Sequence, residues 1–203
     1  MKIVIFGAGK VGRALIKTLE GRKHDIVVVD NNREICDNVA SKSNVNVVCG
    51  DVADPDLLEE LKVGNADYVF AVTGSEETNF LVSVYAKNVN AKRVISRATE
   101  MKYSHLMERL GVHPLVPEQT LARELGNMVL SPLISQMLDP AESSIEMLEE
   151  EVEGWMKEKT VEQVSQKHNF TIISVYDNGK FLFPSLDFVL RKGMRLIIVK
   201  HNI

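Results

Sequence analysis

The sequence predicts an α/β protein whose first part is a Rossmann-like, doubly wound parallel sheet. Three observations support this prediction. Short β-branched runs alternate with amphipathic helical segments, a glycine-rich turn follows the first run, and the second run ends in an aspartate. After this sheet we expect a linker helix and a small α+β C-terminal domain. The expected domain boundaries are 1–118, 119–140 and 141–203.

Five short apolar runs are expected to form the parallel strands. The run that ends at Asp30 contains four consecutive aliphatic residues, and because it has no polar face it suits the middle of a sheet. A short sixth strand is expected at Leu115-Val116. The five main strands are predicted over Lys2–Phe6, Asp25–Asp30, Val45–Cys49, Tyr68–Val72 and Lys92–Ser96.

Helical segments separate these strands. In Lys10–Leu19 apolar residues recur every three or four positions, and Asp54-Pro55 supplies an N-cap and a first-turn proline for another helix. Right-handed crossovers between parallel strands then place helices on both faces of the sheet. The other helices are predicted over Asn32–Ala40, from Ser75 or Glu76 onward, and over Met101–Leu110.

Glu118–Leu138 is expected to form one long helix with a broad apolar side. Pro132 lies well inside it, and because proline removes a helical hydrogen bond and clashes one turn back, we expect a kink or break near Leu130–Pro132. Asp139-Pro140 is expected to end the helix. The apolar side could pack on its own domain, but a helix outside a completed sheet favours contact with a second subunit.

The C-terminal segment has the pattern of a small α+β unit. Asp177-Asn178-Gly179 contains residues typical of a tight hairpin turn. The glutamate-rich segment Ser144–Glu153 leaves two alternatives open, an edge strand and an acidic helix. The other predicted elements are a helix over Val161–Lys167 and strands over Phe170–Tyr176, Lys180–Phe183 and Met194–Lys200.

The composition excludes several classes of protein. The 203 residues are 45% hydrophobic and 26% charged, as in ordinary globular chains. The net charge of −4 argues against a nucleic-acid partner, which usually needs a basic face. Cys36 and Cys49 are too few for a disulfide framework and are not spaced like metal ligands, so a reducing cytoplasm is the simplest compartment. No apolar run reaches 18 residues, and we expect no direct membrane insertion.

The strongest motif is Gly7-Ala8-Gly9-Lys10-Val11-Gly12, which follows a predicted strand and begins a predicted helix. Gly7 permits the tight turn, Gly9 lets a pyrophosphate approach the backbone, and Gly12 lets helix and strand pack closely. The helix N-terminus offers free N–H groups to phosphates. Lys10 could reach a phosphate or be merely solvated. Asp30 can accept hydrogen bonds from ribose hydroxyls and would repel a 2′-phosphate, which favours NAD or an unphosphorylated-ribose adenine nucleotide over NADP.

Two further segments lie where ligands bind in open α/β sheets, outside the carboxyl ends of strands. Gly50-Asp51 follows the third strand, where an adenine would lie. Thr73-Gly74 follows the fourth strand, where backbone and hydroxyl groups could meet a phosphate or the nicotinamide ribose. Both pairs are therefore predicted to contact the ligand, although plain turns would also use these residue types.

The whole pattern resembles the cytoplasmic regulatory subunits of Trk/Ktr-type potassium uptake systems, whose nucleotide domain is also called the regulator of potassium conductance (RCK) domain. The resemblance covers about the first 118 residues and is weaker in the C-terminal unit. The matching segments are MKIVIFGAGKVG at the start, VVVD ending at Asp30, GDVADPDLLEEL from Gly50, ADYVFAVTGSEETN from Ala66 to Asn79, RVISR ending at Arg97, and VPE at Val116–Glu118.

The resemblance implies a cytoplasmic protein, peripheral to the membrane through a potassium transporter or channel subunit, whose homodimers assemble into a ring. It implies NAD(H) as the first choice of ligand, with ATP or ADP as the alternative, and a nucleotide-dependent conformational change that gates potassium uptake. Glu118 would help to bind a divalent cation between subunits. By the same resemblance Gly7, Ala8, Gly9, Lys10 and Val11 would hold phosphates, Asp30 the ribose, Asp51 and Val52 the adenine region, and Thr73, Gly74 and Arg97 the rest of the site.

The rival interpretation is an NAD-dependent oxidoreductase, which needs an acid/base group beside the nicotinamide. Tyr176 and Lys180 have the Tyr-xxx-Lys spacing of one dehydrogenase class, but they flank the predicted hairpin turn instead of lying on a helix. The five histidines are scattered, and the chain has no GxxxxGK[ST] loop. We therefore expect a regulator and not an enzyme, with a stand-alone soluble nucleotide or redox sensor as a further alternative.

Overall fold

The computed structural model of the chain describes residues 1–138, 145–168 and 170–201. The chain divides into two compact units, Met1–Ala122 and Arg123–Ile203. Each unit has its own sheet and its own buried apolar residues.

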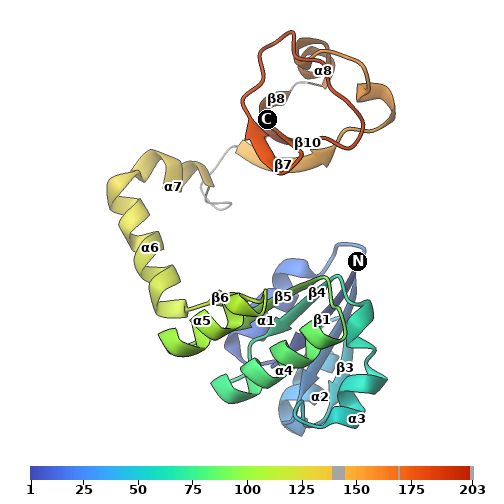
Figure 1. Cartoon of the computed structure of the whole chain (residues 1–203), viewed down its shortest axis with the longest axis vertical. Helices are drawn as coiled ribbons and strands as arrows, with labels where there is room; N and C mark the ends of the chain where they lie inside the picture. Colours follow the sequence, from blue (N-terminus) through green and yellow to red (C-terminus); the bar gives the residue numbers. More distant parts are fainter. Residues whose placement is uncertain (139–144, 169, 202–203) are drawn as a thin grey trace. The chain divides into compact units, whose positions relative to one another are not determined.

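The first unit contains a six-stranded parallel sheet with the strand order β3-β2-β1-β4-β5-β6 (Figure 1). This order starts at β1 and winds outward in both directions, as in the doubly wound dinucleotide-binding fold. The prediction of a Rossmann-like sheet is therefore confirmed. The strands are β1 (Lys2–Phe6), β2 (Asp25–Asp30), β3 (Asn46–Cys49), β4 (Tyr68–Ala71), β5 (Arg93–Arg97) and β6 (His113–Leu115).

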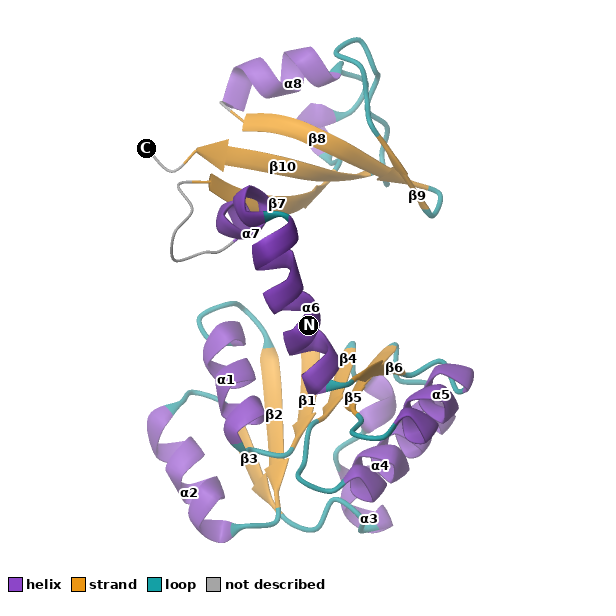
Figure 2. Cartoon of the chain, turned by 90° about the vertical axis from the view of Figure 1, so that its left-hand side faces the viewer, coloured by secondary structure: helices purple, strands orange, loops and turns teal. Residues whose placement is uncertain are grey.

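Helices cover both faces of this sheet (Figure 2). Side chains alternate along β1, so that Ile3 and Ile5 pack with helices α1 and α2, while Val4 and Phe6 pack with α3, α4 and α5 on the opposite face. The central strands are thus buried on both sides, which explains their unbroken aliphatic runs. The helices are α1 (Lys10–Leu19), α2 (Arg33–Lys42), α3 (Pro55–Glu60), α4 (Glu76–Asn88) and α5 (Met101–Arg109).

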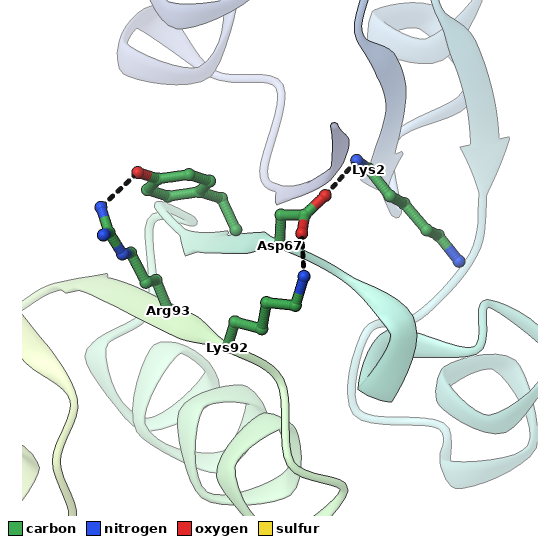
Figure 3. A network of polar contacts seen from close by, with 5 residues as sticks. Lys2, Asp67, Lys92 and Arg93 are labelled. Atoms are coloured by element: carbon green, nitrogen blue, oxygen red, sulfur yellow. Dashed lines mark hydrogen bonds and ion pairs between the residues drawn. The ribbon is translucent and has the colours of Figure 1, made fainter. Parts of the chain in front are cut away.

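A polar network joins the amino-terminal ends of three strands (Figure 3). The carboxylate of Asp67 accepts hydrogen bonds from the backbone N–H of Lys2 at 2.8 Å and from Nζ of Lys92 at 2.6 Å. Beside it, the guanidinium of Arg93 donates to the hydroxyl of Tyr68. The Lys92 ammonium, and next the Lys2 N–H, hold the pKa of Asp67 below its ordinary value. This end of the sheet is therefore fastened by polar contacts between neighbouring strands.

The long helix predicted over Glu118–Leu138 is two helices, α6 (Pro117–Leu130) and α7 (Pro132–Leu138). The carbonyl of Ser131 accepts a hydrogen bond from the N–H of Ser135 at 3.0 Å, so Ser131 caps α7 and Pro132 occupies its first turn. The break expected near Pro132 is confirmed, whereas the prediction of one helix over the whole segment is wrong. The predicted helix end at Asp139-Pro140 lies outside the described residues. The sixth strand ends at Leu115, one residue before the predicted end at Val116.

The second unit contains an antiparallel sheet with the order β7-β10-β8-β9. The glutamate-rich segment forms the edge strand β7, which settles the choice between strand and helix. Tyr176 and Lys180 lie on opposite sides of the Asn178-Gly179 turn and not on a helix, as expected. The elements are β7 (Ile145–Glu151), α8 (Val161–His168), β8 (Phe170–Asp177), β9 (Lys180–Leu182) and β10 (Arg195–His201). None of the helices within the described ranges is long and apolar enough to span a membrane.

Candidate nucleotide-binding site

A cavity of about 580 Å³ opens at the carboxyl ends of β1, β2 and β4, where the strand order reverses. This is the position at which doubly wound sheets bind ligands. The cavity brings together ten of the twelve residues predicted to contact a nucleotide. They are Gly7, Gly9, Lys10, Val11, Asp30, Asp51, Val52, Thr73, Gly74 and Arg97.

The turn between β1 and α1 has the geometry that its glycines allow. Gly7 has a φ of +101°, and a Cβ there would lie 2.8 Å from the backbone of Thr73. A Cβ on Gly12 would lie 1.9 Å from the carbonyl oxygen of Gly7. At Gly9, by contrast, a Cβ would meet no heavy atom of the described residues within 4 Å. Gly7 and Gly12 are therefore needed for packing, whereas the space over Gly9 is open to a ligand.

The N-terminus of α1 faces this cavity and favours an anion. Gly9 is the N-cap and has no side chain that could bond to the N–H groups of the first turn, and the first turn contains no acidic residue. These N–H groups carry the positive end of the helix dipole. Lys10, which is exposed and lines the cavity, adds a full positive charge. The arrangement suits a phosphate or pyrophosphate.

Asp30 at the end of β2 is held in the cavity by two backbone groups. Its Oδ2 accepts a hydrogen bond from the N–H of Ala8 at 2.7 Å, and its Oδ1 accepts one from the N–H of Asn32 at 2.9 Å. A carboxylate can accept about four hydrogen bonds, so capacity remains for a ribose hydroxyl. Ala8 acts through its backbone, because its side chain is fully buried and does not line the cavity.

Asn79 links the ends of β4 and β5. The side chain is 1% exposed, and its Oδ1 accepts hydrogen bonds from the N–H and the hydroxyl of Thr73 at 2.9 and 2.7 Å. Its Nδ2 donates to the carbonyl oxygens of Thr73 and Arg97, both at 3.3 Å. One amide therefore fixes both backbone segments that border this side of the cavity. The prediction from sequence included the segment but gave Asn79 no role.

Arg97, the last residue of β5, lines the cavity and has an unpaired donor. Its Nε is buried and has no hydrogen-bond partner among the residues that the structure describes. Buried donors are almost always paired, and a guanidinium suits phosphate and carboxylate oxygens. The carboxylate of Glu76 accepts from the N–H groups of Thr99 and Glu100, so the chain just beyond Arg97 is also anchored to α4. Arg97 lines the cavity, and its guanidinium suits an anionic ligand there.

Two of the predicted contact residues, and the predicted metal ligand, lie elsewhere. Ala8 and Gly12 support the turn without lining the cavity, and Glu118 is exposed in the first turn of α6. Within the described ranges no three His, Cys, Asp or Glu side chains are grouped as a metal site. Sequence reasoning missed several lining residues, although the Ser75 N-cap of α4 was a recognisable signal for that loop. The missed residues are Val29, Asn31, Asn32, Ile35, Val72, Ser75 and Thr78.

Comparison with known proteins agrees with this geometry. The family model of the TrkA-N domain matches residues 3–117. A Trk system potassium uptake protein TrkA homolog from Methanothermobacter thermautotrophicus is 29% identical, and the alignment covers 100% of this chain and 95% of that protein. The relative is named as a potassium uptake protein and not as an enzyme.

Solved structures of GsuK are similar to parts or most of the chain. The GsuK RCK domain is 24% identical with a TM-score of 0.55, and the match covers 98% of this chain and 45% of that chain. A structure of GsuK bound to ADP is 26% identical with a TM-score of 0.56, covering 64% of this chain and 35% of that chain. This chain thus spans less than half of either GsuK chain. Since the family model covers more than half of the 203 residues, the chain belongs to the TrkA-N domain family.

Proposed function

We propose that the chain is a nucleotide-binding regulatory subunit of a membrane potassium uptake system. The observation that supports this most is the meeting of three features in one cavity: the uncapped N-terminus of α1, the guanidinium of Arg97 and the carboxylate of Asp30. The first two suit phosphates and the third suits a ribose. The kinship with TrkA potassium uptake proteins supports the link to potassium transport.

The proposed ligand is NAD(H), with ATP or ADP as the alternative. A 2′-phosphate beside the Asp30 carboxylate would suffer like-charge repulsion, so NADP is disfavoured. The volume of about 580 Å³ lies in the usual range for cofactor sites. The structure of GsuK bound to ADP, at 26% identity, supports an adenine nucleotide of either kind. The site residues that we propose are the ten lining residues named above, with Ala8 and Gly12 as supports.

Regulation would depend on the loop from Thr73 to Asn79. A nucleotide bound at the N-terminus of α1 would also touch Thr73 and Arg97, and Asn79 bonds to the backbone of both. Movement of one segment is therefore transmitted to the other. Ligands that favour different positions of this loop would shift the protein between two conformations, which requires different affinities for the two. Gating of the potassium system would follow from that shift.

We further propose that α6 and α7 join two subunits, and that dimers assemble into a ring at a membrane partner. Val129, Leu130 and Leu133 are 79%, 83% and 78% exposed, and Leu121, Leu125, Met128 and Ile134 are also exposed. Contiguous exposed apolar residues are typical of protein interfaces. Under this proposal residues 1–118 bind nucleotide, 119–140 connect and dimerise, and 141–203 form a separate small domain. Glu118 would then take part in cation binding between subunits. The assembly would lie in the cytoplasm, peripheral to the membrane through its partner.

One set of titrations tests the nucleotide proposal. Calorimetry with NADH, NAD, ATP, ADP and NADPH should give measurable binding of one or more of the first four and much weaker binding of NADPH. NADH mixed with the protein and common electron acceptors should stay unconsumed beyond the buffer rate. Steady consumption would favour the oxidoreductase, and absence of binding to all five ligands would contradict the proposed site.

A second experiment tests the partner. The tagged protein is purified from membranes of its own host under mild conditions, with the Leu130→Glu variant as a matched control that disturbs the proposed interface. A potassium transporter or channel subunit should co-purify with the wild type in larger amounts than with the variant. Recovery of a soluble protein alone would favour the stand-alone sensor.

A further inference from the structure

The two cysteines of the chain meet beside the nucleotide cavity. Cys36 lies in α2 and Cys49 ends β3, thirteen residues later in the sequence. Sγ of Cys36 donates to the backbone carbonyl of Asp30 at 3.3 Å, and Asp30 is the β2 residue paired with Cys49 in the sheet. Burial, and next the contact with the Cys49 side chain, raise the pKa of the Cys36 thiol to about 11. The Cys36 thiol and Cys49, the strand partner of Asp30, therefore both adjoin the Asp30 backbone.

The two thiols differ in access. Cys49 is exposed, whereas Cys36 is 3% exposed. An oxidant in solution therefore reaches Cys49 first, and the protonated, buried Cys36 is left as the partner that reacts second. A solvent-accessible thiol near a second thiol is one feature of redox-sensing pairs.

We propose that Cys36 and Cys49 form a redox-active dithiol that closes to an intramolecular disulfide and narrows the nucleotide cavity. The oxidant is a low-molecular-mass disulfide. The Cys49 thiolate attacks one of its sulfurs, and one small thiolate leaves. The Cys36 thiolate then attacks Sγ of Cys49, and the second small thiolate leaves. The two protein thiols are oxidised, the small disulfide is reduced to two thiols, and the two protein protons end on those thiols.

Closure affects the cavity because both cysteines adjoin its walls. Ile35 precedes Cys36, and Asp51 and Val52 follow Cys49 closely; all three of these neighbours line the cavity. A disulfide is about 2.0 Å long, much shorter than a contact between two thiols, so α2 and the end of β3 must approach each other. Closure also removes the Cys36 hydrogen bond to Asp30. This effect on the cavity rests on the nucleotide site proposed above, whereas disulfide formation does not.

The first test measures the disulfide without any nucleotide. The full chain is equilibrated in glutathione buffers with increasing fractions of oxidised glutathione, quenched with acid and alkylated. Its mass is then measured by mass spectrometry. The wild type should lose two hydrogens and both free thiols without gaining glutathione. Cys36→Ser should instead retain one glutathione on Cys49, and Cys49→Ser should keep its buried thiol. A wild type that accumulates mixed disulfide, or that links two chains, would overturn the proposal. Thermal unfolding of both variants confirms that they are folded.

The second test compares ADP and NADH affinity for the reduced and the oxidised wild type. The oxidised form should bind at least about fivefold more weakly, and by reciprocity the nucleotide should shift the glutathione midpoint by the same factor. Equal affinities would overturn the narrowing of the cavity. If the reduced protein binds neither nucleotide, the proposed function fails while the first test still decides the thiol chemistry.

Discussion

Alanine substitutions at Gly9 and Gly12 separate the two roles of the glycine-rich turn. Each adds one methyl group, but Gly12→Ala should disturb the packing of the turn, whereas Gly9→Ala should disturb ligand binding. In Gly12→Ala the new Cβ would lie 1.9 Å from the carbonyl oxygen of Gly7, where ordinary contact begins at 3.4 Å. The turn must therefore shift by about 1.5 Å, the difference between these distances. Because the obstacle is backbone, we take the upper end of the overpacking cost, about 3 kcal/mol.

Part of this cost is offset because alanine is about 1 kcal/mol more favourable than glycine inside a helix. The net loss expected for Gly12→Ala is about 2 kcal/mol, or roughly 8 °C in melting temperature for a unit of this size. In Gly9→Ala nothing lies within 4 Å of the new Cβ. The poorer N-cap costs about 0.7 kcal/mol and the stiffer unfolded chain returns a similar amount, so stability should stay within about 0.5 kcal/mol of the wild type.

For nucleotide affinity we expect the opposite order, with Gly9→Ala as the more harmful substitution. The methyl group added by Gly9→Ala would occupy the space that a pyrophosphate needs, and we expect at least about a tenfold loss of affinity, or about 1.4 kcal/mol, for the best nucleotide. Urea unfolding followed by circular dichroism measures the stabilities, and calorimetry measures the affinities. A Gly9→Ala variant that binds as tightly as the wild type would refute the position assigned to the phosphates. A Gly12→Ala variant of unchanged stability would refute the packing argument.

Three further predictions concern single side chains. Asn79→Ala leaves three backbone groups near the cavity without their partner and should lower the free energy of unfolding by about 2–4 kcal/mol in urea titrations; Ser83→Ala, which removes one buried bond to the Asn79 carbonyl, is the control and should cost about 1 kcal/mol. The lowered pKa of Asp67 adds stability above about pH 4, and this stability is lost as the pH falls through the pKa of the folded protein. Asp67→Asn should therefore make the melting temperature depend less on pH over that acidic range, and an unchanged pH dependence would contradict this. Asp30→Asn removes the charge that opposes a 2′-phosphate and should raise the affinity for NADPH relative to NADH. An unchanged ratio of the two affinities in calorimetry would exclude contact between Asp30 and the ribose 2′-hydroxyl.

Most of the first unit could be predicted from the sequence because its signals are local. The uninterrupted aliphatic run before Asp30 indicates a strand buried on both faces, and the glycine turn between a strand and a helix restricts the backbone by sterics alone. The break at Pro132 has the same local origin, since a proline acts on the turn that precedes it. Ten of twelve predicted contact residues consequently line one cavity.

The glutamate-rich strand β7 shows where local signals end. Its charges are compatible with a solvated helix, and only pairing with β10 selects the strand. There Glu149 meets Arg195, and Glu150 lies 3.5 Å from Lys200. These cations are more than forty residues away in the sequence, so no window around β7 contains them.

The sequence alone determined the fold class, the glycine-rich turn after the first strand and the aspartate at the end of the second, because periodicity and turn chemistry depend on residues within about twenty positions of one another. The tertiary structure alone decided what meets at the carboxyl edge of the sheet. Asn79 bonds to Arg97, eighteen residues further along the chain, and Cys36 bonds to the carbonyl of Asp30, the strand partner of Cys49. Those contacts depend on strand order and register, which bring the ends of parallel strands together whatever their separation in the chain.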